Sequence, residues 1–563
     1  MKKLLSVFLA VLMIFSVFSL AAFAEDKEEK HVKCPVIFIA GTSIEICDAE
    51  GNVIPSGFEV LTAEDDGEDS YTKEQIIETV FNILLPFVSE GLPFDKWDNY
   101  GDALYEELAP IWDETQLDGD GNAKYGTGVS KKQVEKWDDI AKNVNAGADG
   151  KFSLTDYQFI YDWRLSPYDH VDRLHKYIET VRETTDCNQV ALFGRCIGGG
   201  LIDAYLEKYG EYGYVKKVFY DEVLSNGCAA ISECFSGKID FSDKHMQAYI
   251  QQTEYFGKQG SIVDLRGIND LTIEVVTRLV DLFTQVGVVD VVLDDLKELY
   301  DRLYGAFMPS MLLASGFATW GSHWVSVYDG DFEAAIDLIF GKEGSERRTE
   351  YAGLIEKLEY IREHLTSQRP DMYNKFVEEY KVQFGVMASY GLADAPIIEH
   401  HDETGDTLAG IQDSSFGATS AGLFTTLSEK HIEEKVAAGK GDYISPDKKI
   451  DASTCLFPET TWFLKNNPHN FNVASGLAEY FTQYDNVTVS SNKRNYSRFL
   501  IIDSSSPKGY SNMTEDNCAD GPWLDVVEQE PTIATRLAAL MRLLTVILEI
   551  ITMLMNGGSL FGL

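Results

Sequence analysis

The feature that most constrains the fold of this chain is a short apolar run that turns sharply into a helix. Residues 189–193 (Gln-Val-Ala-Leu-Phe) are apolar and partly β-branched, which is typical of a strand buried on both faces of a parallel sheet. Beyond the turn, apolar residues recur at helical spacing as far as Gly210. The sequence therefore predicts a strand, a tight turn and a helix, the unit from which parallel α/β sheets are built.

The turn itself reads Gly194-Arg195-Cys196-Ile197-Gly198. Its glycines allow neighbouring backbones to approach closely, and the central residue of such a strand-to-helix turn is held in a strained conformation. The central side chain points into the cleft above the sheet, and the next amide is free to stabilise an oxyanion. Cys196 is therefore the candidate nucleophile, and the Ile197 amide is one candidate oxyanion donor.

Other segments predict the rest of an α/β domain. A helical period runs through residues 167–185, just before the elbow strand. Apolar strand patterns separated by helices imply a mostly parallel central sheet with both faces covered. The predicted strands besides the elbow strand are residues 35–39, 157–161, 217–223, 384–390 and 461–464.

Two insertions interrupt this pattern. Helical patterns dominate from Cys228 to about residue 380, which predicts a large helical cap over the cleft. The predicted organisation is a signal peptide (1–24), a first part of the core (25–227, with an insertion at about 44–150), the cap (228–380), a second part of the core (381–530) and a C-terminal amphipathic helix (531–563).

The N-terminus predicts export. Lys2 and Lys3 precede an apolar run from Leu4 to Leu20, and residues 22–24 (Ala-Phe-Ala) are typical of a cleavage site. We therefore expect a secreted, extracellular protein. The formal net charge of −42 argues against nucleic acid as a partner, because nucleic-acid binding needs basic surface.

Eight cysteines in an exported chain permit disulfides. Cys34 with Cys47, and Cys228 with Cys234, are near in sequence and plausible pairs. If Cys196 is free, seven cysteines remain, so at least one other thiol is unpaired. The connectivity stays open at this stage.

A cysteine nucleophile needs a base, and the base needs an orienting acid. At elbows of this kind the three residues follow in the order nucleophile, acid, histidine. His469 is the one histidine beyond the last predicted strand, and it lies in an Asn/Pro-rich turn suited to reach back over the sheet. We therefore predict His469 as the base.

Three aspartates are candidates for the acid. Asp447 precedes His469 by 22 positions, in a loop that continues to an apolar anchor and small hydroxyl residues, and it is the preferred candidate. Asp451 and Asp406 are the alternatives. The turn after the first strand supplies the second oxyanion donor, from the amide of Thr42 or Ser43.

Metal ligation is not expected. Residues 400–403 (His-His-Asp-Glu) suggest a metal site, but adjacent side chains point in different directions and no third ligand follows at a fitting spacing. We interpret this stretch as a solvated loop, and we predict neither a metal nor a cofactor.

The combination resembles the lecithin:cholesterol acyltransferase branch of the α/β-hydrolases. The resemblance rests on the strand and turn of residues 35–43, the Tyr-Asp-Trp-Arg block at 161–164, the elbow at 192–199, the segment 447–469, and the aromatic stretch 320–335 of the predicted cap. It implies an α/β-hydrolase fold and cleavage or transfer of acyl groups from lipid esters through an acyl-enzyme, without a cofactor.

Two residues depart from that family. Cys196 replaces the usual serine, and Arg195 replaces the usual histidine before it. Thiol elbows occur in related hydrolases, and a thiol at a helix N-terminus beside the cation of Arg195 is expected to be a good nucleophile. The expected function is a secreted acyl-ester hydrolase or acyltransferase. The alternative is a catalytically inactive protein that binds lipid or cell envelope on the same scaffold.

The last residues predict an amphipathic helix. From residue 531 the chain is strongly apolar, with a narrow polar stripe that includes Arg542 and Glu549. The cost of burying Glu549 in lipid argues against a membrane span. The helix is expected to pack onto the body, or to lie in a lipid interface and bring the protein to a membrane or the cell envelope.

Overall fold

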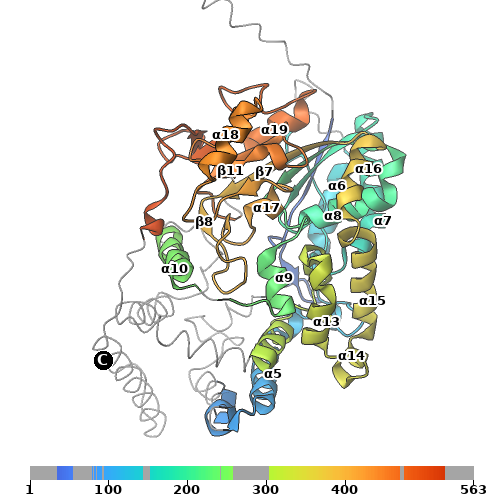
Figure 1. Cartoon of the computed structure of the whole chain (residues 1–563). Coiled ribbons are helices and arrows are strands. Elements are labelled where there is room, and N and C mark those ends of the chain that lie inside the picture. The colour runs from blue at the N-terminus through green and yellow to red at the C-terminus, as the bar shows by residue number, and fades with distance from the viewer. Residues whose placement is uncertain are drawn as a thin grey trace, which may run out of the picture.

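The computed structural model describes residues 34–54, most of 79–143, 152–257 except Phe241, 304–469 and 475–525. At its centre is an eight-stranded sheet with the strand order β14-β13-β12-β7-β6-β5-β1-β4 (Figure 1). All neighbouring strands are parallel except β13 and β14. The strands are β1 (Val36–Ile39), β4 (Tyr157–Gln158), β5 (Val190–Arg195), β6 (Val215–Asp221), β7 (Gln383–Tyr390), β12 (Thr461–Lys465), β13 (Phe499–Ile502) and β14 (Tyr510–Asn512).

Successive strand residues point to opposite faces of the sheet, and both faces are buried. On one face, residues such as Leu192 and Val218 pack against α7 (Val171–Thr185) and α8 (Gly198–Tyr209) in the main hydrophobic core. On the other face, residues such as Phe193 pack against α19 (Ser475–Gln483). Continuous apolar strands were the sequence signal for this arrangement, and the mostly parallel α/β sheet is confirmed.

The predicted elements agree closely with those observed. Each of the six predicted strands corresponds to one of β1, β4, β5, β6, β7 and β12, and the two predicted helices beside the elbow strand are α7 and α8. Sequence analysis missed the antiparallel edge formed by β13 and β14. Three short antiparallel pairs were not predicted either: β2 (Ile46–Cys47) with β3 (Gly128–Val129), β8 (Leu392–Ala393) with β9 (Thr404–Gly405), and β10 (Thr419–Ser420) with β11 (Ile450–Asp451).

The described residues between β6 and β7 are mostly helical, as predicted for the cap segment, and residues 304–314 are helical in addition to the helices named below. Figure 1 shows α9 and α13 side by side below the sheet, and these two helices pack closely together. The helices of this segment are α9 (Ala229–Ser236), α10 (Asp243–Gly257), α13 (Phe332–Phe340), α14 (Glu346–Glu350), α15 (Ala352–Ile361) and α16 (Arg369–Glu378).

The remaining helices are α5 (Asp98–Trp112) and α6 (Lys131–Ala141) in the first insertion, then α17 (Ile411–Ser414) and α18 (Glu429–Ala437) beyond β7. The predicted signal peptide (1–24) and C-terminal helix (531–563) lie outside the described residues. Within the described part of the chain, no helix combines the length and apolar character that crossing a bilayer requires.

Candidate active site

Cys196 lies in the sharp turn between β5 and α8. Its φ angle is +53°, a left-handed conformation that residues with a side chain adopt at a cost, so the turn is held by its surroundings. Gly41, in the turn after β1, lies against it: a Cβ atom on Gly41 would come within 2.8 Å of the Cys196 Cβ and 3.3 Å of its Sγ. The predicted strand–turn–helix geometry around Cys196 is therefore present, and the turn after β1 reaches the thiol.

The Tyr-Asp-Trp-Arg block supports this turn. The Tyr161 hydroxyl donates to the Ala40 carbonyl (2.7 Å), and the Trp163 indole N–H donates to the Ile44 carbonyl (2.9 Å). Arg164 and Asp162 form a buried ion pair at 2.7 Å behind them. The block thus anchors both ends of the 40–44 turn, and this role was not evident from the sequence.

The proposed oxyanion donors lie on the two segments that meet at the thiol. Ile197 follows Cys196 as the N-cap residue of α8 and is buried. Thr42 follows Gly41 in the turn after β1, and its side chain is exposed. Their positions are compatible with amides directed at one oxygen.

His469 pairs with Asp406. The His469 Nδ1 atom lies 2.8 Å from Oδ2 of Asp406, and the His469 backbone amide donates to the Asp406 carbonyl at 2.7 Å. The other oxygen, Oδ1, accepts the amides of Leu408 (3.1 Å) and Ala409 (2.7 Å). Asp406 is therefore held as an acceptor on both oxygens and orients the imidazole.

The other ring nitrogen of His469 is available toward the thiol. Nε2 is buried, with no hydrogen-bond partner among the described residues. Burial lowers the pKa of His469, but Asp406 and the Cys196 thiol raise it more, and the net shift is upward. Because the thiol is among the groups that act on the imidazole, Cys196, His469 and Asp406 form one contiguous cluster.

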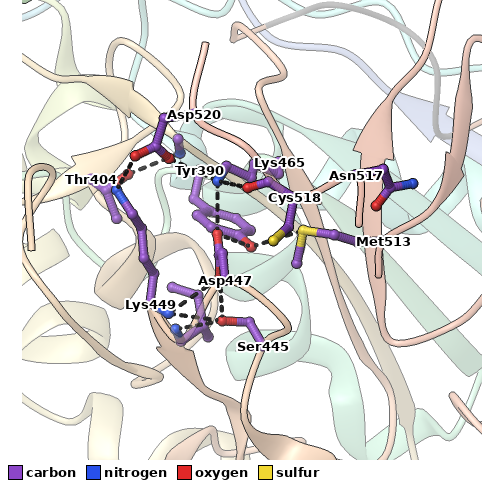
Figure 2. A network of polar contacts seen from close by, with 12 residues as sticks. Tyr390, Thr404, Ser445, Asp447, Lys449, Lys465, Met513, Asn517, Cys518 and Asp520 are labelled. Atoms are coloured by element: carbon purple, nitrogen blue, oxygen red, sulfur yellow. Dashed lines mark hydrogen bonds and ion pairs between the residues drawn. The ribbon is translucent and has the colours of Figure 1, made fainter. Parts of the chain in front are cut away.

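The preferred acid, Asp447, lies elsewhere, and that prediction is wrong. Figure 2 shows its carboxylate within a network of polar side chains around Lys465. It pairs with Lys465 at 2.9 Å and accepts from the hydroxyls of Ser445 (2.5 Å) and Tyr390 (3.1 Å). Its oxygens are thus taken up by a buried lysine and two hydroxyls, while Asp406 occupies the position beside His469.

The second alternative, Asp451, is also committed to other partners. It pairs with Lys435 at 2.8 Å and with His431 at 2.9 Å, beside α18. Sequence separation misled the choice, because Asp447 and Asp451 are 22 and 18 positions before His469 and Asp406 is 63. The loop that carries Asp406 returns to the sheet through the β8–β9 hairpin, which has too few residues to be recognised in the sequence.

Arg195 and the other cysteines modify two further expectations. The Arg195 guanidinium is shared with Asp221, whose Oδ2 lies 2.9 Å from Nε, so it is not an unpaired cation beside the thiol. All eight cysteines are free in the structure, so neither Cys34 with Cys47 nor Cys228 with Cys234 forms a disulfide. Cys196 is accordingly a free thiol.

Sequence analysis missed Glu222, which follows β6. Its carboxyl accepts hydrogen bonds from the Ser389 hydroxyl (2.5 Å) and the Asn467 side-chain amide, and it is buried. Acceptor and ring atoms of Glu222, Asp406 and His469 all lie within 4.8 Å of one another. The position of Glu222 just after a predicted strand could have indicated it, because the carboxyl ends of neighbouring parallel strands meet at one edge of the sheet.

The side chains of Glu222, Asp406 and His469 are of the kinds that bind metal ions. Their hydrogen bonds fit a proton relay toward the thiol better than a metal site. The Nδ1 atom that would coordinate a metal already bonds to Asp406, and Nε2 is directed to the thiol cluster instead. The 400–403 stretch is not solely a solvated loop, because His400 pairs with the buried Glu233 of α9.

Comparisons with known protein families, with curated proteins and with solved structures found no match. The case for a function therefore rests on the geometry of the site in this chain.

We expect the protein to become more stable as the pH falls from 8 to 6.5. Burial and neighbouring carboxylates raise the pKa of Glu222 and of Glu403 to about 8, above their usual 4.5. The folded state then binds more protons than the unfolded state in this window, so the free energy of unfolding falls as the pH rises. Below 6.5 the trend is opposed, because burial lowers the pKa of His245 and His323 to about 4.

The expected gain is about 2 kcal/mol, after discounting the two carboxyls for relaxation of their surroundings. Urea unfolding at pH 6.5 and pH 8.0 at constant ionic strength measures it. A Glu222→Gln/Glu403→Gln double variant is the control and should lose most of the difference. An equal stability of the native chain at both pH values would contradict this account of the buried carboxyls.

Proposed function

We propose that this chain is an α/β-hydrolase that cleaves or transfers acyl groups through a thioester at Cys196. The single observation that carries the proposal is the Cys196–His469–Asp406 cluster. Its members follow three different strands of the central sheet: Cys196 follows β5, Asp406 follows β7 and His469 follows β12. That chain order is the one expected for a nucleophile, acid and base on an α/β-hydrolase sheet. The resemblance to the lecithin:cholesterol acyltransferase branch makes a lipid ester the proposed substrate.

The first half-reaction follows from the cluster. His469 takes the Cys196 proton at Nε2, and the sulfur attacks the ester carbonyl carbon, so that a C–S bond forms and the carbonyl electrons move to oxygen. The amides of Ile197 and Thr42 are the proposed donors to this oxyanion, and their hydrogen bonds would stabilise its charge. When the C–O bond breaks, the departing alkoxide takes the proton from His469.

In the second half-reaction, water or an alcohol attacks the thioester and His469 accepts its proton. The C–S bond breaks, the acid or the new ester leaves, and the proton returns to Cys196. Asp406 holds Nδ1–H throughout, which fixes the tautomer that leaves Nε2 as the base. Hydrolysis and transfer share every group of this site and differ only in the acceptor.

The test is turnover of p-nitrophenyl esters from acetate to palmitate by the chain that begins at Glu25, with denaturing mass spectrometry of the protein during turnover. We expect release of p-nitrophenol and an acyl mass on the peptide that contains Cys196. The preferred chain length then indicates whether lipids are the substrate.

Two variants make the result specific. Cys196→Ala should abolish both turnover and the adduct, whereas Cys187→Ala, which removes a buried free thiol at the far end of β5, should retain both. Equal, near-background rates in the native chain and Cys196→Ala would overturn the catalytic proposal in favour of a binding protein on this scaffold.

A further inference from the structure

The carboxyl of Glu222 has no part in the three-residue mechanism, yet it lies within the cluster. It extends from the residue after β6, where the backbone has a φ angle of +51°, and its amide bonds to the Met387 carbonyl of β7. An unusual backbone conformation at the end of a central strand is retained only where its surroundings enforce it. The side chain is thereby directed between the Asp406 loop and the loop that carries His469.

Two carboxyl groups this close do not both ionise readily. Asp406 accepts two backbone amides and faces the His469 ring, so both of its oxygens have partners. Glu222 accepts from the neutral donors Ser389 and Asn467 and is surrounded by protein. Of the two, Glu222 is therefore the acid that keeps its proton at neutral pH.

We propose that Glu222 is a positioning residue whose ionisation controls the charge state of the Cys196–His469 couple. This inference rests on the proposed function. As a neutral acid, Glu222 adds no charge beside the imidazole. When Glu222 loses its proton, a second negative charge within 4.8 Å stabilises the imidazolium, so that the proton moves from the Cys196 sulfur to Nε2 more readily. The proton lost by Glu222 goes to solvent.

The groups around Glu222 support this assignment. Burial is the largest effect on its pKa, followed by the charges of Asp406 and Asp221, and together they raise it to about 8. His469 and the Ser389 hydroxyl act in the opposite direction. The titratable and charged groups that face Glu222 are Asp221 on β6, Arg195 on β5, Asp406 beyond β9 and His469 beyond β12.

The experiment measures alkylation of Cys196 by iodoacetamide from pH 5 to 10, followed by mass spectrometry of the Cys196 peptide. We expect a plot of the alkylation rate against pH to show a limb in the native chain, that is, a rise of at least about tenfold centred near pH 8. An opposite charge at this separation changes a proton equilibrium by about that much or more. In Glu222→Gln, which keeps the shape and an acceptor oxygen, that limb should disappear while any later thiol ionisation remains.

Two further variants separate titration of Glu222 from a general disturbance. Glu403→Gln is a matched control: Glu403 is another buried acid with a pKa raised to about 8, but it is not among the groups that act on His469, so the limb should remain. Ser389→Ala removes a donor that lowers the pKa of Glu222, so the limb should move to higher pH.

A limb at the same pH in Glu222→Gln and Ser389→Ala would overturn the inference and leave the proposed function intact, provided that Cys196 is still the thiol acylated by esters. Absence of ester turnover and of an acyl adduct in the native chain would instead overturn the proposed function. If Glu222→Gln does not fold, the shift in Ser389→Ala decides the matter alone.

Discussion

Replacing Asp406 by asparagine should lower kcat for ester turnover by about 10³–10⁴-fold, because the acid of a triad fixes the histidine tautomer and stabilises the imidazolium. In the proposed mechanism Asp406 performs both tasks at one atom, since its Oδ2 lies 2.8 Å from Nδ1. An asparagine amide in the same place presents an N–H to Nδ1 and favours the tautomer with the proton on Nε2. That tautomer cannot accept the Cys196 proton.

The matched comparison is Asp447→Asn. This aspartate was preferred from its sequence position, but it pairs with Lys465 and lies outside the cluster around His469. We expect its kcat per folded molecule to fall at least about tenfold less than that of Asp406→Asn, because an asparagine oxygen can still accept from the Lys465 ammonium and Asp447 acts on His469 only through the end of β12. The folded fraction of each variant is measured by near-ultraviolet circular dichroism, so that a loss of folded protein is not mistaken for a loss of rate. A larger loss in Asp447→Asn than in Asp406→Asn would refute the assignment.

The fold could largely be predicted because its signals are local and strong. Central parallel strands bury both faces, so segments such as β5 and β7 are nearly continuous apolar runs. The elements that escaped prediction are short or lie at the edge. A two-residue strand such as β9 has no periodicity to recognise, and its existence depends on a partner elsewhere in the chain.

The residues of the candidate site likewise differ in whether a local sequence pattern indicates them. Cys196 has a recognisable frame because its strained turn requires particular neighbours, and His469 follows the last long parallel strand, so topology alone suggests it. Asp406 and Glu222 carry no local pattern. Their roles depend on where the β8–β9 hairpin and the end of β6 bring their carboxyls, a property of the folded chain that spacing in sequence does not measure.

Neither of the two plausible cysteine pairs forms a disulfide, for a related reason. Nearness in sequence does not bring two thiols together when secondary structure separates them. Cys228 and Cys234 lie at the N-cap and near the end of α9, and the Cys228 thiol donates to the Leu408 carbonyl at 3.2 Å instead. Cys34 donates to the carbonyl of Gln189, beside the start of β5.

The network that holds Asp447 explains why the loop of His469 is well placed. Lys465 is the last residue of β12, its side chain is fully buried, and it pairs with Asp447 (2.9 Å) and Asp520 (2.8 Å) (Figure 2). It also donates to the Cys518 carbonyl at 2.7 Å. One ammonium thus joins the end of a central strand to two distant segments, immediately before the turn that leads to His469.

Replacing Lys465 by methionine should therefore destabilise the protein by about 3–5 kcal/mol, because removal of the lysine leaves the buried carboxylate of Asp447 uncompensated. Burial lowers the pKa of Lys465, but Asp447 and Asp520 raise it further, so the ammonium is charged at neutral pH and its loss removes a full charge. Urea unfolding measures the effect as a lower midpoint at an unchanged slope.

Lys216→Met is the matched control. Lys216 pairs with Asp485 at 2.8 Å, a similar distance, but both side chains are about a quarter exposed, so water screens the pair and replaces it when it is lost. The expected cost is below about 1 kcal/mol. Equal costs for the two variants would mean that the pairing of Lys465 contributes no more than a surface ion pair, and the Asp447 network would then not be what holds the His469 turn at the end of β12.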